Sequence, residues 1–413
     1  MKKTISSLFM TCIGLLFTIH LSFSQANRTD AAGFWRAELP TVAGMLPFHL
    51  SLEMENGKLQ AYAINGKEKL GLDTPFFKND SLHIPMEIFD AEIIAHLSGS
   101  SMKGIFNRKA SNLSLRTVPF SAQKNQYHRF ENEKKDVSNT NISGTWEVKF
   151  TTETGSYPSV GILEQTGSQV TGTFLTTTGD YRFLAGDIVG DSLKLSCFDG
   201  NHVFLFKAKI NDAKLEGGVF CAAFSYTEKW EAVKNPAATL PDPTTLTYLK
   251  PGFETIDFAF KNTKNELVRL QDERYKGKVV LVQIMGSWCP NCMDESRFLA
   301  PYYQKNKDKG VEIIGLAYEK STDPTFAYPK LDRMKERFGI EYEILLAGTN
   351  DKEVAARSLP MLSKILSFPT LLILDKKGKV REIHTGFSGP GTGKYYDKFV
   401  SDFYGLMEKL LAE

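Results

Sequence analysis

Apolar and polar positions follow two different patterns along the chain. Over residues 33–234 they alternate in short runs, as where Leu50 and Leu52 are separated by a serine, and Asn56-Gly57 marks a hairpin turn. This alternation is typical of antiparallel strands with one buried and one solvated face. From about residue 249, buried-strand patterns alternate with helical periods, which indicates a βαβ order and a parallel core. We therefore predict a multidomain protein with an antiparallel all-β region, either barrel or sandwich, followed by an α/β domain.

The β region repeats itself at a fixed displacement. Gly33-x-Trp35 returns as Gly144-x-Trp146, and Pro47 returns as Pro158, each 111 residues later. Such a colinear set predicts an internal duplication, with six or seven short strands in each copy. The predicted units are β repeat 1 at residues 25–120, a polar surface connection at 121–141, and β repeat 2 at 142–234.

The C-terminal part has its own order of elements. A proline-rich stretch at 235–248 predicts a stiff linker that holds an α/β domain, residues 249–413, beside the β region without merging with it. The predicted strands are 279–285, 311–317, 342–346, 370–374 and 380–384, and the predicted helices are 291–307, 330–338 and 394–411.

The N-terminus is typical of an export signal. Residues 1–24 carry Lys2 and Lys3 ahead of an apolar run that ends in small residues. We predict a periplasmic or other extracytoplasmic protein after removal of this leader. The alternative is a leader kept as an anchor at the outer face of a membrane. The formal charge of +2 falls to about zero without the two lysines, which argues against a nucleic-acid partner.

Cys289 and Cys292 form a C-x-x-C pair where the strand at 279–285 gives way to a helix. This is the layout of a redox dithiol, because helix N-terminal N–H groups and the helix dipole stabilise a thiolate. Cys289 is the predicted nucleophile, and Cys292 would resolve the mixed disulfide. A zinc site would need further ligands, and haem attachment would need a histidine where Met293 stands, so we predict neither metal nor cofactor.

Other residues around the pair have candidate supporting roles. Trp288 would pack beside the thiolate and form a platform for substrate, and Pro290 follows the nucleophile. Pro369, after Phe368, directly precedes a predicted hairpin strand and is a candidate cis proline. Glu295 would either complement the helix dipole or accept the proton of the resolving thiol.

Two further cysteines of the mature chain, Cys197 and Cys221, lie on the inward side of their predicted strands. In a plain meander a third strand would separate them by roughly 9 to 10 Å, too far for a disulfide. Closure across a sandwich would bring them together. Both possibilities stay open, with buried free thiols as the default.

These features together resemble the TlpA and ResA group of exported thioredoxin-like disulfide reductases. The resemblance covers residues 249–413 and rests on Trp288-Cys289-x-x-Cys292, Glu295 and Phe368-Pro369-Thr370. It implies a thioredoxin fold, thiol–disulfide exchange on proteins outside the cytoplasm, a cis peptide at Pro369 facing the cysteines, and a role for Glu295 in setting thiol pKa values. The Pro-Asn dipeptide between the cysteines departs from the group, which more often has a proline next to the second cysteine.

The leading functional hypothesis is an exported thiol–disulfide oxidoreductase that reduces disulfides in client proteins and is recharged by a membrane-embedded thiol donor. A peroxiredoxin-type peroxidase is the first alternative, but such enzymes have threonine where this chain has Gly286. The second alternative is a binding protein that holds an apolar ligand or a client in a β-barrel mouth, with the redox domain as an accessory.

Overall fold

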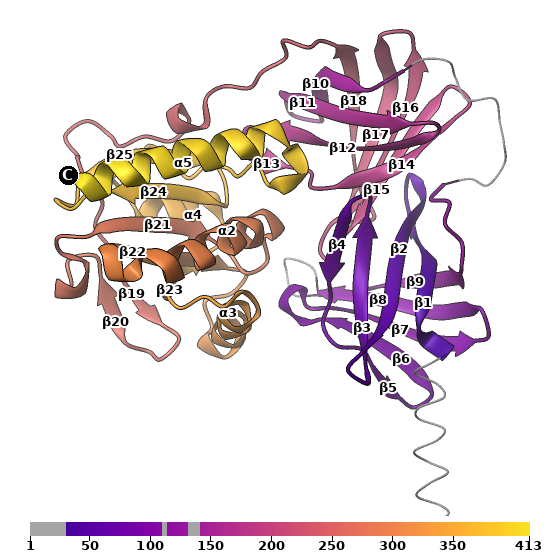
Figure 1. The fold of residues 1–413 in the computed structure, drawn as a ribbon, viewed down its shortest axis with the longest axis horizontal. Helices are drawn as coiled ribbons and strands as arrows, with labels where there is room; N and C mark the ends of the chain where they lie inside the picture. Colours follow the sequence, from indigo (N-terminus) through magenta and orange to yellow (C-terminus); the bar gives the residue numbers. More distant parts are fainter. Residues whose placement is uncertain (1–29, 110–113, 131–140) are drawn as a thin grey trace, which may run out of the picture.

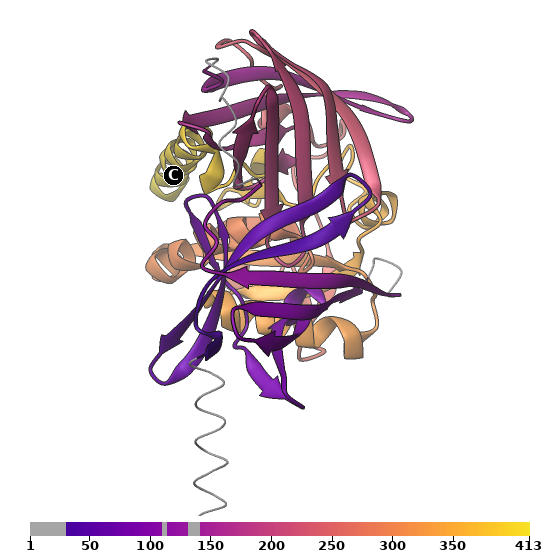
Figure 2. The same ribbon diagram turned by 90° about the vertical axis from the view of Figure 1, so that its right-hand side faces the viewer.

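The computed structural model describes residues 30–109, 114–130 and 141–413 of the chain. Two antiparallel β units lie on one side of the molecule and an α/β unit lies on the other (Figure 1). Figure 2, turned by 90°, shows the two β units in front of the α/β unit. The predicted leader falls outside the described residues, as does the segment 131–140 of the predicted connection. None of the helices in the described ranges is long and apolar enough to cross a bilayer.

The first β unit is an open sheet of nine strands in the order β4-β3-β2-β1-β9-β8-β7-β6-β5. One face of each long strand is apolar and buried, as the alternating pattern predicts. Its strands are β1 (Gly33–Thr41), β2 (Gly44–Glu55), β3 (Lys58–Asn65), β4 (Glu68–Gly71), β5 (Phe76–Lys78), β6 (Ser81–Met86), β7 (Ala91–Ser98), β8 (Ser101–Lys109) and β9 (Leu115–Lys124), with the short helix η1 (Glu87–Phe89) before β7.

The second β unit closes into a barrel. Pairing of β12 with both β11 and β14 joins eight strands into a ring, and the two-residue β13 adds to its edge. Its strands are β10 (Gly144–Thr152), β11 (Gly155–Thr166), β12 (Gln169–Thr176), β13 (Gly179–Asp180), β14 (Leu184–Val189), β15 (Ser192–Phe198), β16 (Val203–Asn211), β17 (Lys214–Ala222) and β18 (Tyr226–Lys234). Aromatic rings pack in its interior, among them Phe206 stacked on Phe220 at 4.4 Å and Phe150 edge-on to Phe174 at 5.8 Å. An apolar ligand site in the barrel mouth stays a prediction.

The two β units have equivalent strands. β10 and β11 begin 111 residues after β1 and β2, and the strand order of the barrel matches that of the open sheet apart from the closing pair. The conserved geometry extends to side chains, because the indole N–H of Trp35 donates to the Ala31 carbonyl at 2.8 Å and that of Trp146 donates to the Ile142 carbonyl at 2.9 Å. This correspondence supports the predicted duplication, although each unit has more strands than the six or seven expected.

The second unit packs against the open sheet of the first unit. Phe198, at the end of β15, stacks on Phe48 of β2 at 4.1 Å and meets Phe106 of β8 edge-on at 5.5 Å. Arg129 is buried between the units and donates to Asn65 Oδ1 at 3.1 Å. The predicted surface connection at 121–141 therefore needs correction. Its first residues belong to β9, and this arginine is inside the molecule.

The cysteines of the second unit are both buried and unbonded. Cys197 on β15 and Cys221 on β17 lie on either side of β16, in register with Phe204 and Leu205 respectively. This is the meander arrangement, in which an intervening strand prevents a disulfide. A disulfide between these two cysteines is therefore not supported.

The α/β unit is built on a sheet in the order β20-β19-β23-β22-β21-β24-β25. β21 lies inside the sheet between β22 and β24, is buried at all seven positions, and is parallel to β22 and antiparallel to β24. The elements are β19 (Ala259–Asn262), β20 (Leu267–Arg269), η3 (Glu273–Tyr275), β21 (Val279–Met285), α2 (Pro290–Asn306), η4 (Lys307–Lys309), β22 (Val311–Glu319), α3 (Pro324–Phe338), β23 (Glu343–Thr349), α4 (Lys352–Ser358), β24 (Thr370–Leu374), β25 (Val380–Thr385), η5 (Pro390–Thr392) and α5 (Lys394–Ala412).

Local capping explains where this unit differs from the predicted elements. α3 starts six residues before the predicted start at 330, because the Asp323 side chain accepts from the Thr325 N–H at 2.9 Å and Pro324 occupies the first helical position. α4 was not predicted; Asp351 caps it, and it is only seven residues long. The predicted hairpin of β24 with β25 and the amphipathic final helix are confirmed.

The proline-rich stretch predicted an α/β domain held beside the β region without merging with it, and the structure differs from this prediction. That segment, residues 235–248 with η2 (Pro243–Thr245), connects units that are docked against each other. Basic residues of α3 pair with acidic residues of the first β unit. These pairs are Lys330 with Asp90 at 2.5 Å, Arg333 with Glu87 at 2.9 Å and Arg337 with Asp73 at 2.9 Å.

Candidate active site

Cys289 lies at the N-terminus of α2, directly after the central strand β21. It is the N-cap residue of the helix, and its sulfur accepts a hydrogen bond from the Cys292 N–H at 3.2 Å. Pro290 occupies the first helical position, where its missing N–H costs nothing and its fixed φ suits the helix. The N–H groups of the first turn and the positive end of the helix dipole therefore lie beside the Cys289 sulfur.

The loop that precedes β24 brings Phe368 and Pro369 to the cysteines. The Phe368–Pro369 peptide is cis, as the resemblance implies. The Cys289 thiol donates to the Phe368 carbonyl at 3.3 Å. The structure thus places a sulfur, a helix N-terminus and a backbone carbonyl together from segments 79 residues apart.

Trp288 is held against the same loop. Its indole N–H donates to the Tyr318 carbonyl at 2.8 Å, and its ring meets that of Phe368 edge-on at 5.6 Å. A Cβ at Gly286 would lie 2.3 Å from the indole nitrogen, so there is no room here for the threonine of a peroxidatic site. The backbone before Trp288 is fixed by buried Glu319, which accepts from the Ser287 N–H at 2.7 Å and hydroxyl at 2.8 Å.

Cys292 and Glu295 lie deeper, one turn apart on the buried face of α2, and both side chains are inaccessible to solvent. Burial, followed by the hydrogen bond with Cys289, raises the pKa of the Cys292 thiol well above its ordinary value. Burial also raises the pKa of Glu295 to about 8, although a hydrogen bond from the Gln283 amide at 2.8 Å opposes this. The other carboxyl oxygen of Glu295 has no hydrogen-bond partner in the described part of the chain. A carboxyl with this pKa can exchange a proton near neutral pH.

The raised pKa of Glu295 predicts a pH dependence of stability. Between its ordinary value of 4.5 and about 8, the folded protein binds a proton that the unfolded chain has lost, so stability falls as pH rises through this window. Glu295→Gln cannot ionise and removes this contribution. As pH rises through the window, the free energy of unfolding of the reduced variant should increase relative to that of the reduced wild type. The expected increase is up to about 1.4 kcal/mol per pH unit, measured by urea denaturation. Glu336→Gln, an exposed helical control, should not change the slope.

The second β unit also contributes to the site, which the sequence did not indicate. The turn between β12 and β13 lies against the loops around Cys289. The Ser367 hydroxyl donates to the Thr178 carbonyl at 2.5 Å, and the Asn291 side chain donates to the Asp180 carbonyl at 3.1 Å. A cleft of about 240 Å³ remains between the two units, with Cys289 on one wall and His202 on the other.

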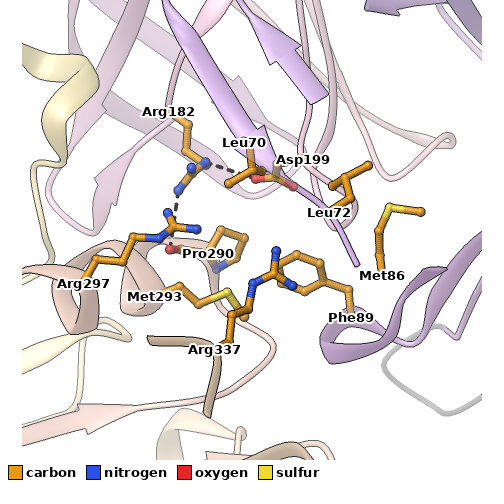
Figure 3. Close-up of a pocket in the computed structure, with 10 residues that line it drawn as sticks. All are labelled: Leu70, Leu72, Met86, Phe89, Arg182, Asp199, Pro290, Met293, Arg297 and Arg337. Carbon is orange, nitrogen blue, oxygen red and sulfur yellow. Dashed lines mark hydrogen bonds and ion pairs between the residues drawn. The ribbon is translucent and has the colours of Figure 1, made fainter. Parts of the chain in front are cut away.

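Arg182, beside this turn, is buried where all three units meet (Figure 3). Its guanidinium pairs with Glu68 of the first unit at 2.6 Å, with Asp199 of the second at 3.1 Å, and with Asp294 of α2. The carboxylates raise the pKa of Arg182 well above its usual range, which outweighs the opposing effect of burial. One guanidinium therefore ties the helix that carries Cys289 to both β units.

The residues that the sequence analysis missed share one property, which is that their partners are remote in sequence. Gln283 and Glu319 are polar residues inside apolar strand patterns, and that mismatch could have marked them as residues of a site. Asp180 and Arg182 stand in a turn-like stretch of the β region, where polar residues are ordinary. Among the described residues no group of three or more His, Cys, Asp or Glu side chains is arranged to hold a metal ion.

The α/β unit, with a dithiol motif at a helix N-terminus opposite a cis proline, defines a thioredoxin-like redox protein. The family described as Redoxin matches residues 247–398. The thiol-disulfide oxidoreductase ResA of Geobacillus kaustophilus (strain HTA426) is 30% identical over 145 residues, which are 35% of this chain and 74% of the relative. ResA of Bacillus subtilis (strain 168) is 25% identical over 138 residues, which are 33% of this chain and 69% of that protein.

The chain therefore belongs to the ResA family of thiol–disulfide oxidoreductases through its C-terminal unit, and it is an oxidoreductase. Among solved structures, a thiol:disulfide interchange protein of the thioredoxin family from Chlorobium tepidum TLS is similar at 18% identity and a TM-score of 0.30. That similarity covers 42% of this chain and 99% of the other. The β units lie outside the Redoxin match.

Proposed function

We propose that this protein is an exported oxidoreductase that reduces disulfides of client proteins outside the cytoplasm through the dithiol of Cys289 and Cys292. The observation that carries the proposal is the position of the Cys289 sulfur, which accepts the Cys292 N–H at a helix N-terminus and contacts the carbonyl of Phe368. The thiolate is the form of a cysteine that attacks a disulfide, and N–H groups at a helix N-terminus favour that form.

The reaction has two steps, and each breaks one bond and forms one. The Cys289 thiolate attacks a client disulfide, a mixed disulfide forms, and the first client sulfur leaves as a thiolate. Cys292 then loses its proton and attacks the Cys289 sulfur, which releases the second client thiolate and leaves a Cys289–Cys292 disulfide. Glu295, one turn from Cys292 and with a pKa of about 8, is the group we assign to accept that proton.

The flanking residues have supporting roles in this proposal. Trp288 and Phe368 pack edge-on against each other beside the nucleophile, and Pro290 fixes the start of the helix. Pro369 would present the backbone edge along which a client segment pairs. The oxidised dithiol must be reduced again, and we assign this to a membrane-embedded thiol donor. A leader that is kept would hold the protein at the outer face of the membrane.

Reduction of insulin tests the proposal. With dithiothreitol as electron donor, catalytic amounts of the wild-type protein should accelerate precipitation of the insulin B chain over dithiothreitol alone. The same reduced protein should consume hydrogen peroxide no faster than free cysteine does. Peroxide consumption without insulin reduction would contradict the proposal and favour a peroxidase.

A further inference from the structure

The cleft that leads to Cys289 has walls from two units. The α/β unit contributes Trp288, Cys289 and Phe368, and the second β unit contributes the turn after β12 together with Asn201 and His202. Cys289 is only 5% exposed, so a substrate sulfur must pass between these walls to reach it. The β barrel is therefore part of the approach to the redox centre.

The turn of the second β unit that carries Asn201 and His202 is held by several hydrogen bonds. Asp199 is buried at the foot of the turn between β15 and β16, and its carboxylate accepts from the Asn201 N–H at 3.0 Å, the His202 N–H at 2.6 Å and the His202 ring at 2.9 Å. The same carboxylate pairs with Arg182, the residue that joins the three units. A turn anchored in this way is preorganised before a substrate enters the cleft.

The turn between β12 and β13 is fixed to the opposite wall. The Asp180 carboxylate accepts from the Gly389 N–H at 2.6 Å, in addition to the contacts of Ser367 and Asn291 with backbone carbonyls of the turn. A Cβ at Gly179, whose φ is +137°, would lie 2.3 Å from the Asn291 amide. This contact therefore requires glycine, and it closes one side of the cleft.

The size and lining of the cleft limit what can enter. Its volume of about 240 Å³ corresponds to about eight waters at about 30 Å³ each, and it is smaller than the pockets of roughly 300–1,000 Å³ that hold drug-sized ligands. The lining combines aromatic rings, hydroxyl and amide groups with the His202 imidazole, which is already engaged by Asp199 at 2.9 Å. Its one carboxylate, Asp180, is already engaged by backbone N–H groups. This space fits a cysteine and the side chains next to it in an extended segment.

We propose that the second β unit forms half of the substrate site and that Asn201 selects extended cysteine-containing segments whose neighbouring residues are small and uncharged. This inference rests on the proposed function and specifies its substrates. Asn201 is one of the residues that line the cleft together with Cys289, and the polar contacts of its own backbone are those of its N–H with Asp199 and of its carbonyl with Arg108. A change of side-chain volume at residue 201 should therefore alter the cleft and leave the turn intact.

Two peptides test the proposal with the reduced full-length protein. Each carries one cysteine disulfide-bonded to 5-thio-2-nitrobenzoate, flanked by glycine in one peptide and by tryptophan in the other. Attack on the peptide sulfur releases the coloured thiolate, which is followed by stopped-flow absorbance. The wild type should react faster with the glycine peptide, by about tenfold, which is within the usual range for steric discrimination by a pocket.

Variants at residue 201 should change the peptide rates in two different ways, because one substitution widens the cleft and the other narrows it. Asn201→Ala should bring the two rates together, and Asn201→Trp should slow the glycine peptide about tenfold while alkylation of Cys289 by iodoacetamide changes less than about twofold. Asn211→Trp is the matched control, because Asn211 is exposed at the far end of β16, the strand that follows the turn with Asn201, roughly 30 Å away. It should behave as the wild type.

Three outcomes would count against the proposal. An unchanged peptide preference in both Asn201 variants would overturn the role of the wall. If Asn201→Trp slowed the peptide reaction and the iodoacetamide reaction equally, the proposed role of Asn201 would also be overturned, because the substitution would then act on Cys289 itself. If iodoacetamide alkylates Cys289 of the wild type but neither peptide releases the coloured thiolate, the proposed function is wrong, and this inference is wrong with it.

Discussion

Replacing Cys289 by serine should lower insulin reduction to the rate of dithiothreitol alone. A serine hydroxyl does not ionise near neutral pH and forms no bond to sulfur, so the first step of exchange is lost entirely. The helix N-terminus and the Phe368 carbonyl would keep their positions, because serine also caps helices well. The measurement is the turbidity of precipitating B chain at equal protein concentration.

Cys221→Ala is the matched control for this substitution. Cys221 is a buried free thiol of the second β unit, on a strand that does not line the cleft. Its replacement should leave the initial rate of insulin reduction within about twofold of the wild type, because the removed thiol has no part in exchange. If Cys289→Ser kept most of the activity, or if Cys221→Ala lost it, the assignment of the nucleophile would be wrong.

Arg182→Met should destabilise the whole protein by about 3 to 5 kcal/mol, the usual cost of removing one partner from a buried ionic cluster. The substitution removes the guanidinium shared by Glu68, Asp199 and Asp294, all at least nine-tenths buried. Asp294 keeps its pair with Arg297 at 2.6 Å, and Asp199 keeps its contact with the His202 ring at 2.9 Å, whereas Glu68 loses its cation. Because Asp294 is on α2, the loss should also loosen the contact of the redox unit with the β units. Guanidinium denaturation followed by tryptophan fluorescence measures the free energy of unfolding.

The control for Arg182→Met is Arg274→Met. Arg274 pairs with Glu343 at 3.0 Å at the surface of the α/β unit, with 44% of its side chain exposed. Ion pairs of this kind contribute about 1 kcal/mol or less. A similar loss in the two variants would show that the three-unit cluster is no more important than a surface pair.

The sequence was most informative where one short segment determines the structure. The apolar run of β21 predicts a fully buried central strand, and the C-x-x-C that follows predicts a helix N-terminus, so Cys289 and Cys292 could be placed without coordinates. The cis peptide before Pro369 was also predictable, because the resemblance supplied its position. The amphipathic period of α5 had the same local character.

Features that depend on docking between units could not be predicted. Alternating strands are compatible with both an open sheet and a closed barrel. The two units differ in one strand pair, β12 with β14, which closes the second unit and has no equivalent in the first. The proline-rich linker suggested a separate redox domain, but Arg182 and Asp180 attach it to the barrel. Nothing local in a turn signals that its backbone carbonyls will face a catalytic helix.

Trapping of the mixed disulfide is the most direct test of the central claim, which is that Cys289 attacks and Cys292 resolves. Reduced Cys292→Ser protein is mixed with the glycine peptide that carries the 5-thio-2-nitrobenzoate disulfide, and the product is digested and mapped by mass spectrometry. We predict one stable peptide adduct, on Cys289, whereas the wild type should release the peptide and end as a Cys289–Cys292 disulfide. An adduct on Cys197 or Cys221 with Cys289 unmodified would contradict this account.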